Sequence, residues 1–510
     1  MTVSSGGAVQ YRFVTRSALW VGLVAFLVGG LAQLWAHRAN VVFAFWDAQA
    51  HLDIARRVID STTPGLQMLG TVWLPVPHLL LLLPVQVDAW WWNGLSGGLI
   101  GLAAFTMTAV ALHDILARRL TDPRWAWLAV AFVVLNPSLL FLQTTAMTEP
   151  VLLAFLVTAT ALLDRWIDVR SSRLLIGAGI LTALAVGSRY DGWFFAAVAV
   201  LVVVWHARRD ARSALGAMMV FVAPTAVFVT VWLVYNYVYF GDPLAFQRGA
   251  WSAQSQQATL VRQGLLPTRG RPDLALAYYL GAAALACGVV LVIGAMASSW
   301  SALRSRGASA TLLLGAALWF NVIALVAGQS VIALPWTEPP GFLNVRYGVM
   351  LLPAAAAALV LGLDHAGRSR RLPLRAGIAA LALQIALFVL APRLQAGALS
   401  EGIAIRDGDP RQQDASDWLR DHYDGGRVLV DGAINISPRS RIPLRDRVYE
   451  WTWELGAKAL AAPELAVEWV VADAQTPNDA VSRAIGKRPD FRKRFDLVFD
   501  RNGLEIWRRR

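Results

Sequence analysis

The chain has 510 residues, of which 56% are hydrophobic and only 16% are charged, and its mean hydropathy is +0.49. Soluble domains carry about 25% charged residues, so this composition excludes an ordinary soluble protein and indicates a chain that lies in a lipid bilayer. The single cysteine, Cys287, excludes disulfides and cysteine-based metal sites. The net charge of +12 would suit a nucleic-acid partner, but the placement of the basic residues explains it differently.

Apolar runs near the length of a membrane helix, about 20 residues, recur along most of the chain. The eleven candidate spans lie near residues 17–36, 92–114, 125–142, 150–167, 173–187, 193–206, 214–238, 276–298, 309–328, 347–364 and 374–391. The fifth and sixth runs are short, and losing that pair would leave nine spans with the same end orientation. The first run is long and has no clear cleavage site, so we expect a retained anchor. The sequence predicts a polytopic α-helical membrane protein.

Basic residues are grouped in every second connection between these spans. With the N-terminus in the cytoplasm, the cytoplasmic connections carry five groups of arginines: Arg118, Arg119 and Arg124; Arg165, Arg170 and Arg173; Arg208, Arg209 and Arg212; Arg304 and Arg306; and Arg368, Arg370, Arg371 and Arg375. This is the positive-inside pattern, so the charge sets the topology and no nucleic acid is expected as a partner. Only three of the 46 basic residues are lysines, which with the alanine-rich spans suggests a GC-rich bacterial genome. We therefore expect the protein in a bacterial plasma membrane.

The connections on the outer side are longer. Residues 37–91 contain an amphipathic helix at 46–60, followed by the proline-interrupted piece TVWLPVPHLLLLLP, which suits an interfacial or re-entrant segment. Residues 239–275 are polar, and their WSAQSQQATLVRQG portion shows no helical apolar stripe, as in a lid, a binding loop or a disordered segment. We therefore expect the outer side to carry the functional surface.

From residue 395 the composition becomes that of a soluble domain. ASDWLRDHY predicts a helix, GRVLVDG and VEWVVAD predict buried strands, and Asn502-Gly503 between two alternating runs predicts a β-hairpin. We therefore divide the chain into a transmembrane domain over residues 1–394 and an extracytoplasmic α/β domain over residues 395–510. The second domain has neither a phosphate-binding glycine loop nor a cysteine pair, so no chemistry is assigned to it.

Two candidate site residues lie at the start of the amphipathic stretch. Asp47 and His51 are four residues apart and so share one face of a helix. Asp47 suits either a functional acid or an N-terminal helix cap, where aspartate satisfies free backbone N–H groups. His51 suits either a site or a hydrogen-bonded interfacial position.

Further ionisable residues lie at the outer ends of later spans. Glu149 follows the third span in TTAMTEP, where an acid before Pro150 also suits a plain helix start. GSRYDGW places Arg189, Tyr190 and Asp191 between two apolar runs. Ionisable residues at membrane depth are functional candidates, although Arg189 and Asp191 would also neutralise one another in a structural turn.

Arginines are the other feature of the outer side. Arg248 and Arg262 lie in the connection 239–275, and Arg346, followed by Tyr347, abuts a late span, where an arginine also suits the membrane interface. The planar guanidinium suits phosphate oxygens, and a carboxylate beside it is the equipment for general-base transfer from a phosphate ester. No Walker loop, HExxH zinc motif, GxSxG elbow or EF-hand is present.

In these residues the chain resembles the polyprenyl-phosphate-dependent glycosyltransferases of the GT-C type, the superfamily of protein mannosyltransferases and lipid A aminoarabinose transferase. The resemblance covers nearly the whole chain: WDAQAH in the first large external loop, TEP after the third span, the SRYDG turn, the VRY pair near the last spans and an external α/β domain. It implies a single-sugar donor on polyprenyl phosphate, a hydroxyl acceptor on a protein, lipid or glycan, and inversion at the anomeric carbon. The family's loop acid corresponds to Asp47, although Ala48 stands where the family often has a second acid.

Asp47 is therefore the predicted general base, and Arg346, Arg189 and Tyr347 are the predicted phosphate-binding residues. No metal is required in principle, because arginines stabilise a leaving phosphate. A divalent metal at Asp47, His51 and His78 is the alternative, and its spacing matches no metal-site template.

Three other functions suit a chain of this layout. A ligase or polymerase that uses polyprenyl diphosphate favours a cluster of arginines in a late external loop, where this chain has only Arg346. A lipid or solute transporter favours two matching halves, and no such pair is evident. A scaffold that kept the fold without catalysis would have the same sequence features.

Overall fold

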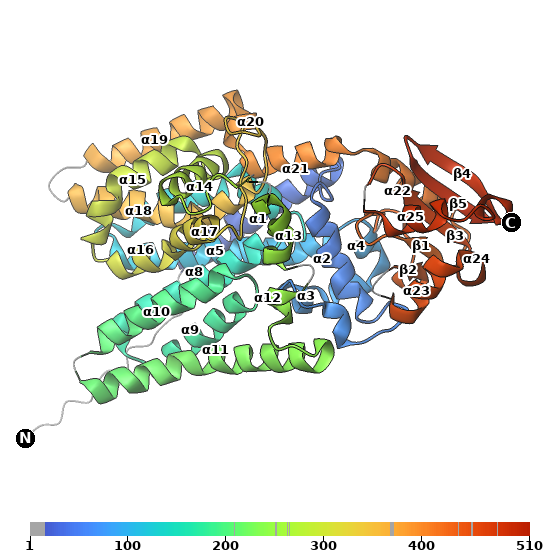
Figure 1. Cartoon of the computed structure of the whole chain (residues 1–510). Helices are drawn as coiled ribbons and strands as arrows, with labels where there is room; N and C mark the ends of the chain where they lie inside the picture. The colour runs from blue at the N-terminus through green and yellow to red at the C-terminus, as the bar shows by residue number, and fades with distance from the viewer. Residues whose placement is uncertain are drawn as a thin grey trace, which may run out of the picture.

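A helical bundle and a small sheet domain lie at opposite ends of the molecule (Figure 1). The structure, a computed structural model, describes residues 16–208, 210–249, 252–262, 264, 266–367, 372–436, 438–449, 452–476 and 478–510. The predicted basic residues Arg209, Arg368, Arg370 and Arg371 lie outside these ranges.

Each of the eleven predicted apolar segments is helical. They form α1 (Arg16–Arg38), α5 (Leu95–Arg119), α6 (Ala126–Val134) with α7 (Pro137–Leu142), α8 (Glu149–Val169), α9 (Ser172–Val186), α10 (Asp191–Ala207), α11 (Ala211–Phe240), α14 (Pro272–Cys287) with α15 (Val289–Leu303), α16 (Ala308–Leu314) with α17 (Ala316–Val326), η4 (Val345–Leu351) with α18 (Leu352–Ala366), and α19 (Leu372–Leu390). Within the described ranges, six helical segments are long and apolar enough to cross a membrane. The predicted fold class is confirmed.

The third predicted span is broken at Asn136. The Oδ1 atom of Asn136 caps α7 by accepting the backbone N–H of Leu139 at 2.8 Å, and Pro137 begins the new helix. The Nδ2 atom of Asn136 donates to the carbonyl of Ala286 at 3.0 Å. The break therefore fixes α7 against the end of α14.

The first long connection folds into short helices beside the bundle. They are α2 (Trp46–Arg57), η1 (Leu66–Leu69), α3 (Val76–Leu81), η2 (Pro84–Gln86) and α4 (Asp88–Trp92). The predicted amphipathic helix is present as α2, and its buried Ala48, Leu52 and Ala55 join the core of the bundle. The apolar residues thus set the depth at which α2 lies.

The connection 239–275 differs from the prediction. Its central part contains α12 (Ala245–Arg248) and α13 (Ala253–Arg262), although the sequence shows no apolar stripe there. Alanine, glutamine, leucine and arginine have favourable helix propensity, which does not require such a stripe. The polar composition predicted the surface location and missed the helix.

The C-terminal region begins with α20 (Pro392–Gln395) and α21 (Gly397–Gly408), and α21 packs against α7 and η4 of the bundle. The sheet domain follows, with α22 (Arg411–His422), β1 (Val428–Val430), η5 (Leu444–Asp446), β2 (Arg447–Val448), α23 (Trp453–Ala461), α24 (Pro463–Ala466), β3 (Trp469–Asp473), α25 (Ala480–Gly486), α26 (Phe491–Arg494), β4 (Phe495–Arg501) and β5 (Leu504–Arg509). The predicted helix and buried strands are confirmed as α22, β1 and β3.

The described strands form one sheet in the order β2-β1-β3-β5-β4. The pairs β1–β2 and β1–β3 are parallel, and β3–β5 and β4–β5 are antiparallel. Asn502 and Gly503 have φ values of 50° and 83°, as a two-residue hairpin turn requires, so the predicted hairpin is confirmed.

Candidate active site

Arg346 lies at the centre of a buried cluster of charges. Its Nη2 atom donates to Oδ2 of Asp47 at 2.6 Å, and its Nη1 atom donates to Oε1 of Glu401 at 2.9 Å. Its Nε atom lies 3.4 Å from Oε1 of Glu149. The three acids come from α2, α21 and α8, so one guanidinium joins three distant parts of the chain.

Glu401 holds Arg346 from two sides. Besides the guanidinium, its carboxylate accepts the backbone N–H groups of Asn344 at 2.7 Å and of Arg346 at 2.9 Å. Asn344 has a left-handed φ of 56°, which turns the chain into η4. Burial raises the pKa of Glu401, against the opposing effect of Arg346 and the two N–H groups.

Arg189 forms the second positive centre. Its Nη1 atom donates to Oε1 of Glu149 and to Oγ1 of Thr148, both at 3.1 Å, and its Nε atom donates to Oδ2 of Asp191 at 3.3 Å. The Oδ1 atom of Asp191 accepts from Nδ2 of Asn321 at 3.2 Å. The predicted Arg189–Asp191 pair is present, and Glu149 connects it to Arg346. We call Asp47, Glu149, Arg189, Asp191, Arg346 and Glu401 the outer cluster.

Aromatic rings flank both guanidiniums. The ring of Tyr347 lies 5.1 Å from Cζ of Arg189 and 5.2 Å from Cζ of Arg346, and the ring of Phe45 lies 4.9 Å from the latter. Rings at these distances attract a cation and exclude water from it. The hydroxyl of Tyr190 donates to the carbonyl of Val72 at 3.1 Å.

The structure excludes the helix-cap interpretation of Asp47. The N-cap residue of α2 is Phe45, and no side chain caps this helix. The side chain of Asp47 is 40% exposed, whereas those of Glu149 and Glu401 are fully buried. Asp47 is therefore the acid of Arg346 that solvent reaches.

His51 lies in a buried pair beside the cluster. Its Nδ1 atom is 2.9 Å from Nε2 of His78, and its ring packs against Trp73 at 4.6 Å. Burial lowers the pKa of His51 to about 3, and the charges of Arg189 and Arg346 act in the same direction. The imidazole is neutral near pH 7. The described residues contain no group of three or more His, Cys, Asp and Glu side chains placed to hold a metal ion.

Two predicted arginines lie apart from the cluster. Arg248 ends α12 and lies 3.7 Å from Asp242, in a largely exposed pair. Arg262 ends α13 with an exposed side chain. Conversely, Glu401 was not predicted from the sequence, because it lies in a segment whose composition is that of the soluble domain.

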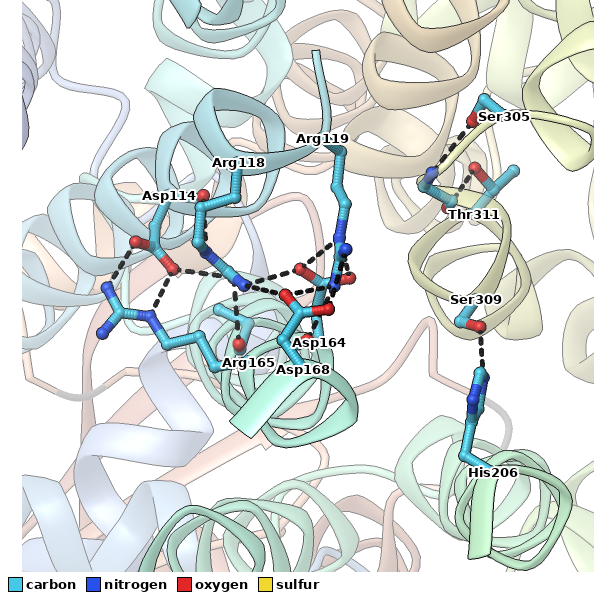
Figure 2. A network of polar contacts seen from close by, with 12 residues as sticks. Asp114, Arg118, Arg119, Asp164, Arg165, Asp168, His206, Ser305, Ser309 and Thr311 are labelled. Carbon is cyan, nitrogen blue, oxygen red and sulfur yellow. Dashed lines mark hydrogen bonds and ion pairs between the residues drawn. The ribbon is translucent and has the colours of Figure 1, made fainter. Parts of the chain in front are cut away.

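A second charged cluster lies at the other end of α8 (Figure 2). It consists of Asp114, Arg118 and Arg119 from α5 and Asp164, Arg165 and Asp168 from α8, and we call it the inner cluster. Arg118 bridges to Asp164 at 2.8 Å and Arg119 to Asp168 at 2.9 Å. Three arginines thus face three aspartates across a single helix pair.

Solved structures of ArnT share the overall architecture of this chain. ArnT from Cupriavidus metallidurans bound to undecaprenyl phosphate matches with a TM-score of 0.57 and 12% identity, over 96% of this chain and 97% of that chain. Its apo structure matches with a TM-score of 0.54 and 14% identity, over 97% and 98%. The apo oligosaccharyltransferase of Archaeoglobus fulgidus gives a TM-score of 0.47 and 14% identity, over 91% and 70%. The fold is that of a multi-pass GT-C membrane protein.

The sequence matches a family within that class. Residues 100–242 match the model of the dolichyl-phosphate-mannose-protein mannosyltransferases. No curated protein sequence matches the chain. The predicted resemblance to GT-C glycosyltransferases, and with it the enzyme class, is confirmed.

Proposed function

We propose that the protein transfers a single sugar from a polyprenyl-phosphate donor to a hydroxyl acceptor, with inversion and with Asp47 as the general base. The observation that carries this proposal is the 2.6 Å contact between Asp47 and Arg346, which sets a solvent-accessible carboxylate beside a guanidinium suited to phosphate. The undecaprenyl phosphate bound to the similar ArnT, and the dolichyl-phosphate-mannose in the family's name, support a donor of this class.

The exposures of the three acids suggest how the donor binds. Glu149 and Glu401 hold two edges of Arg346 from fully buried positions, whereas Asp47 is partly exposed. An entering phosphate replaces Asp47 at Nη2, so one anion is exchanged for another. Asp47 is then released from Arg346 in the presence of the donor.

The transfer step follows from this arrangement. The acceptor oxygen attacks the anomeric carbon from the face opposite the phosphate, and Asp47 takes the hydroxyl proton as the new bond forms. The bond between the anomeric carbon and the phosphate oxygen breaks, and the electron pair leaves with the lipid phosphate. Arg346 and Arg189 stabilise the charge that develops on the phosphate, so the reaction requires no metal.

A turnover assay tests the proposal. Purified protein in lipid nanodiscs is given polyprenyl-phosphate sugars and hydroxyl acceptors, and release of polyprenyl phosphate is measured. Asp47→Asn is expected to lower turnover by about 10²–10⁴-fold, the usual contribution of a general base. Asp273→Asn, an exposed acid paired with Arg271, is the matched control and should retain activity.

Three results would contradict parts of the proposal. Unchanged turnover in Asp47→Asn would show that Asp47 is not the general base. A product with retained anomeric configuration would exclude the single displacement. Release of polyprenyl diphosphate with an oligosaccharide product would identify a ligase.

We further propose that the outer cluster and the sheet domain face the outside of a bacterial plasma membrane. The connections α10–α11 and α15–α16, which carry predicted cytoplasmic arginines, lie at the end of the bundle opposite the sheet domain (Figure 1). In intact cells, a membrane-impermeant thiol reagent should label Leu465→Cys and not Arg124→Cys, both at highly exposed positions. The reverse labelling would invert the topology.

A further inference from the structure

The sheet domain contacts the helix that carries Asp47. Figure 1 shows α2 between the bundle and the sheet. Arg447, at the start of β2, donates through Nη1 to Oδ2 of Asp53 in α2 at 3.0 Å. Arg445 in η5 donates to Oδ1 of Asp60, just beyond α2, at 3.1 Å. Two arginines of one short segment thus meet two acids of the first connection.

The Arg447–Asp53 pair is shielded from water. The two side chains are only 10% and 15% exposed. The other carboxylate oxygen of Asp53 accepts from Nε1 of Trp91 in α4 at 3.1 Å, so the acid also joins α2 to α4. A shielded pair is directional, and removing one partner leaves an uncompensated charge. The exposed pairs at the sheet edge, such as Arg510–Asp496, lack this property.

The remaining support of α2 combines apolar packing with polar contacts. Ala48, Leu52 and Ala55 pack against the bundle with nearly complete burial, and Arg56 donates to the carbonyl of Val85 at 2.8 Å and to the carboxylate of Asp88. The N-terminal end of α2 lacks a side-chain cap. Polar contacts from the sheet domain therefore supplement the packing.

We propose that the sheet domain positions the carboxylate of the general base Asp47, and that Arg447 and Asp53 are positioning residues for it. Six residues of helix separate Asp53 from Asp47, a distance of about 9 Å along the axis, so a rotation or tilt at Asp53 is transmitted to the acid. Misplacing a reacting group by about 1 Å can lower a rate about 100-fold. The expected change in turnover rests on the proposed glycosyl transfer, whereas the expected change in the order of α2 does not.

The test uses the full-length protein in nanodiscs and four variants. Arg447→Gln and Asp53→Asn each break the shielded pair, the double variant Asp53→Arg with Arg447→Asp reverses it, and Arg510→Gln breaks an exposed pair of the same domain as the control. Turnover gives kcat and the donor KM. Hydrogen exchange of residues 46–57 gives the order of α2 without requiring activity.

The two single variants should lower kcat by about tenfold or more with little change in donor KM, and should speed exchange in α2. The reversed pair should restore both readouts toward wild type, which a nonspecific folding defect would not allow. Arg510→Gln should match wild type. Unchanged exchange and kcat in both single variants, or a reversed pair no better than either, would overturn the positioning role. A wild-type protein without turnover would contradict the proposed function, while exchange would still decide the positioning.

Discussion

The two ends of α8 carry charged clusters of opposite character. Fifteen residues separate Glu149 from Asp164, about 22 Å of helix. The inner cluster has three arginines and three aspartates from two neighbouring helices (Figure 2). The outer cluster has four acids and two arginines from five parts of the chain: α2, α8, the turn into α10 with its first residue, η4 and α21.

The difference supports the proposal that the outer cluster is a site and the inner cluster a structural contact. A balanced cluster between adjacent helices neutralises itself and holds the helices together. The outer cluster has an excess of acid, and among the described residues the buried Oε2 atom of Glu149 has no hydrogen-bond partner. In the inner cluster the buried Nη1 atom of Arg118 also has no hydrogen-bond partner, although it lies 2.8 Å from Oδ2 of Asp164. The excess of acid, and not the missing hydrogen bond, therefore distinguishes the outer cluster.

Among the comparisons between the two clusters, Arg346→Gln is expected to have the largest effect. It removes the cation proposed to stabilise the leaving phosphate and should lower kcat by about 10²–10³-fold. Arg165→Gln is the matched change in the inner cluster, where Asp114 keeps its contact with Arg118 at 3.0 Å. Turnover per folded molecule should therefore stay at the wild-type level in Arg165→Gln. Equal losses in both variants would remove the distinction between the clusters.

The next prediction concerns stability, and its effect is smaller: Glu401→Gln should lower the unfolding free energy. Both carboxylate oxygens accept backbone N–H groups. In Glu401→Gln the side-chain NH2 group would face one of these N–H groups, and the hydrogen bond to it would be lost. Such an unsatisfied group costs about 1–3 kcal/mol of unfolding free energy. Asp168→Asn, about half exposed in the inner cluster, should cost less than about 1 kcal/mol. Denaturant unfolding in detergent compares the two, and an equal cost would mean that Glu401 is not a specific support.

The smallest effect concerns pH. Because His51 has a folded pKa of about 3, it is neutral in both states above its ordinary pKa of 6.5. Below pH 6.5 the unfolded chain binds a proton that the folded chain does not. The unfolding free energy therefore decreases as the pH is lowered, by about 1 kcal/mol from pH 6.5 to pH 5.5. His51→Asn should reduce this slope in unfolding measurements at several pH values. An unchanged slope would show that His51 is not buried as a neutral group.

The sequence predicted most of the outer cluster because its members lie at recognisable places. Arg189, Asp191, Glu149 and Arg346 each lie at the end of an apolar run, where an ionisable residue is unusual. The alternation of basic connections predicted that they share one side of the membrane. Which acid meets which arginine depends on tertiary packing, and no local pattern encodes it.

Glu401 shows the limit of this reasoning. It lies in a mixed segment whose composition resembles that of the sheet domain, and its burial arises only because α21 packs on α7 and η4. His78 was considered only as a metal ligand, and its actual contact with His51 depends on how α3 packs against α2. Arg248, another predicted candidate, ends α12 and lies 3.7 Å from Asp242, a contact that also depends on how the chain folds.

The outer cluster joins residues that are far apart in the sequence, so the ribosome adds them to the growing chain at different times. Arg346 follows Asp47 by 299 residues, and Glu401 follows Arg346 by a further 55. At about 5–20 residues per second, the ribosome adds Arg346 roughly 15 to 60 seconds after Asp47. During that interval the early membrane segments hold an acid without its arginine. If the proposed function holds, a nascent chain that ends before Arg346 lacks the cation that binds the donor phosphate.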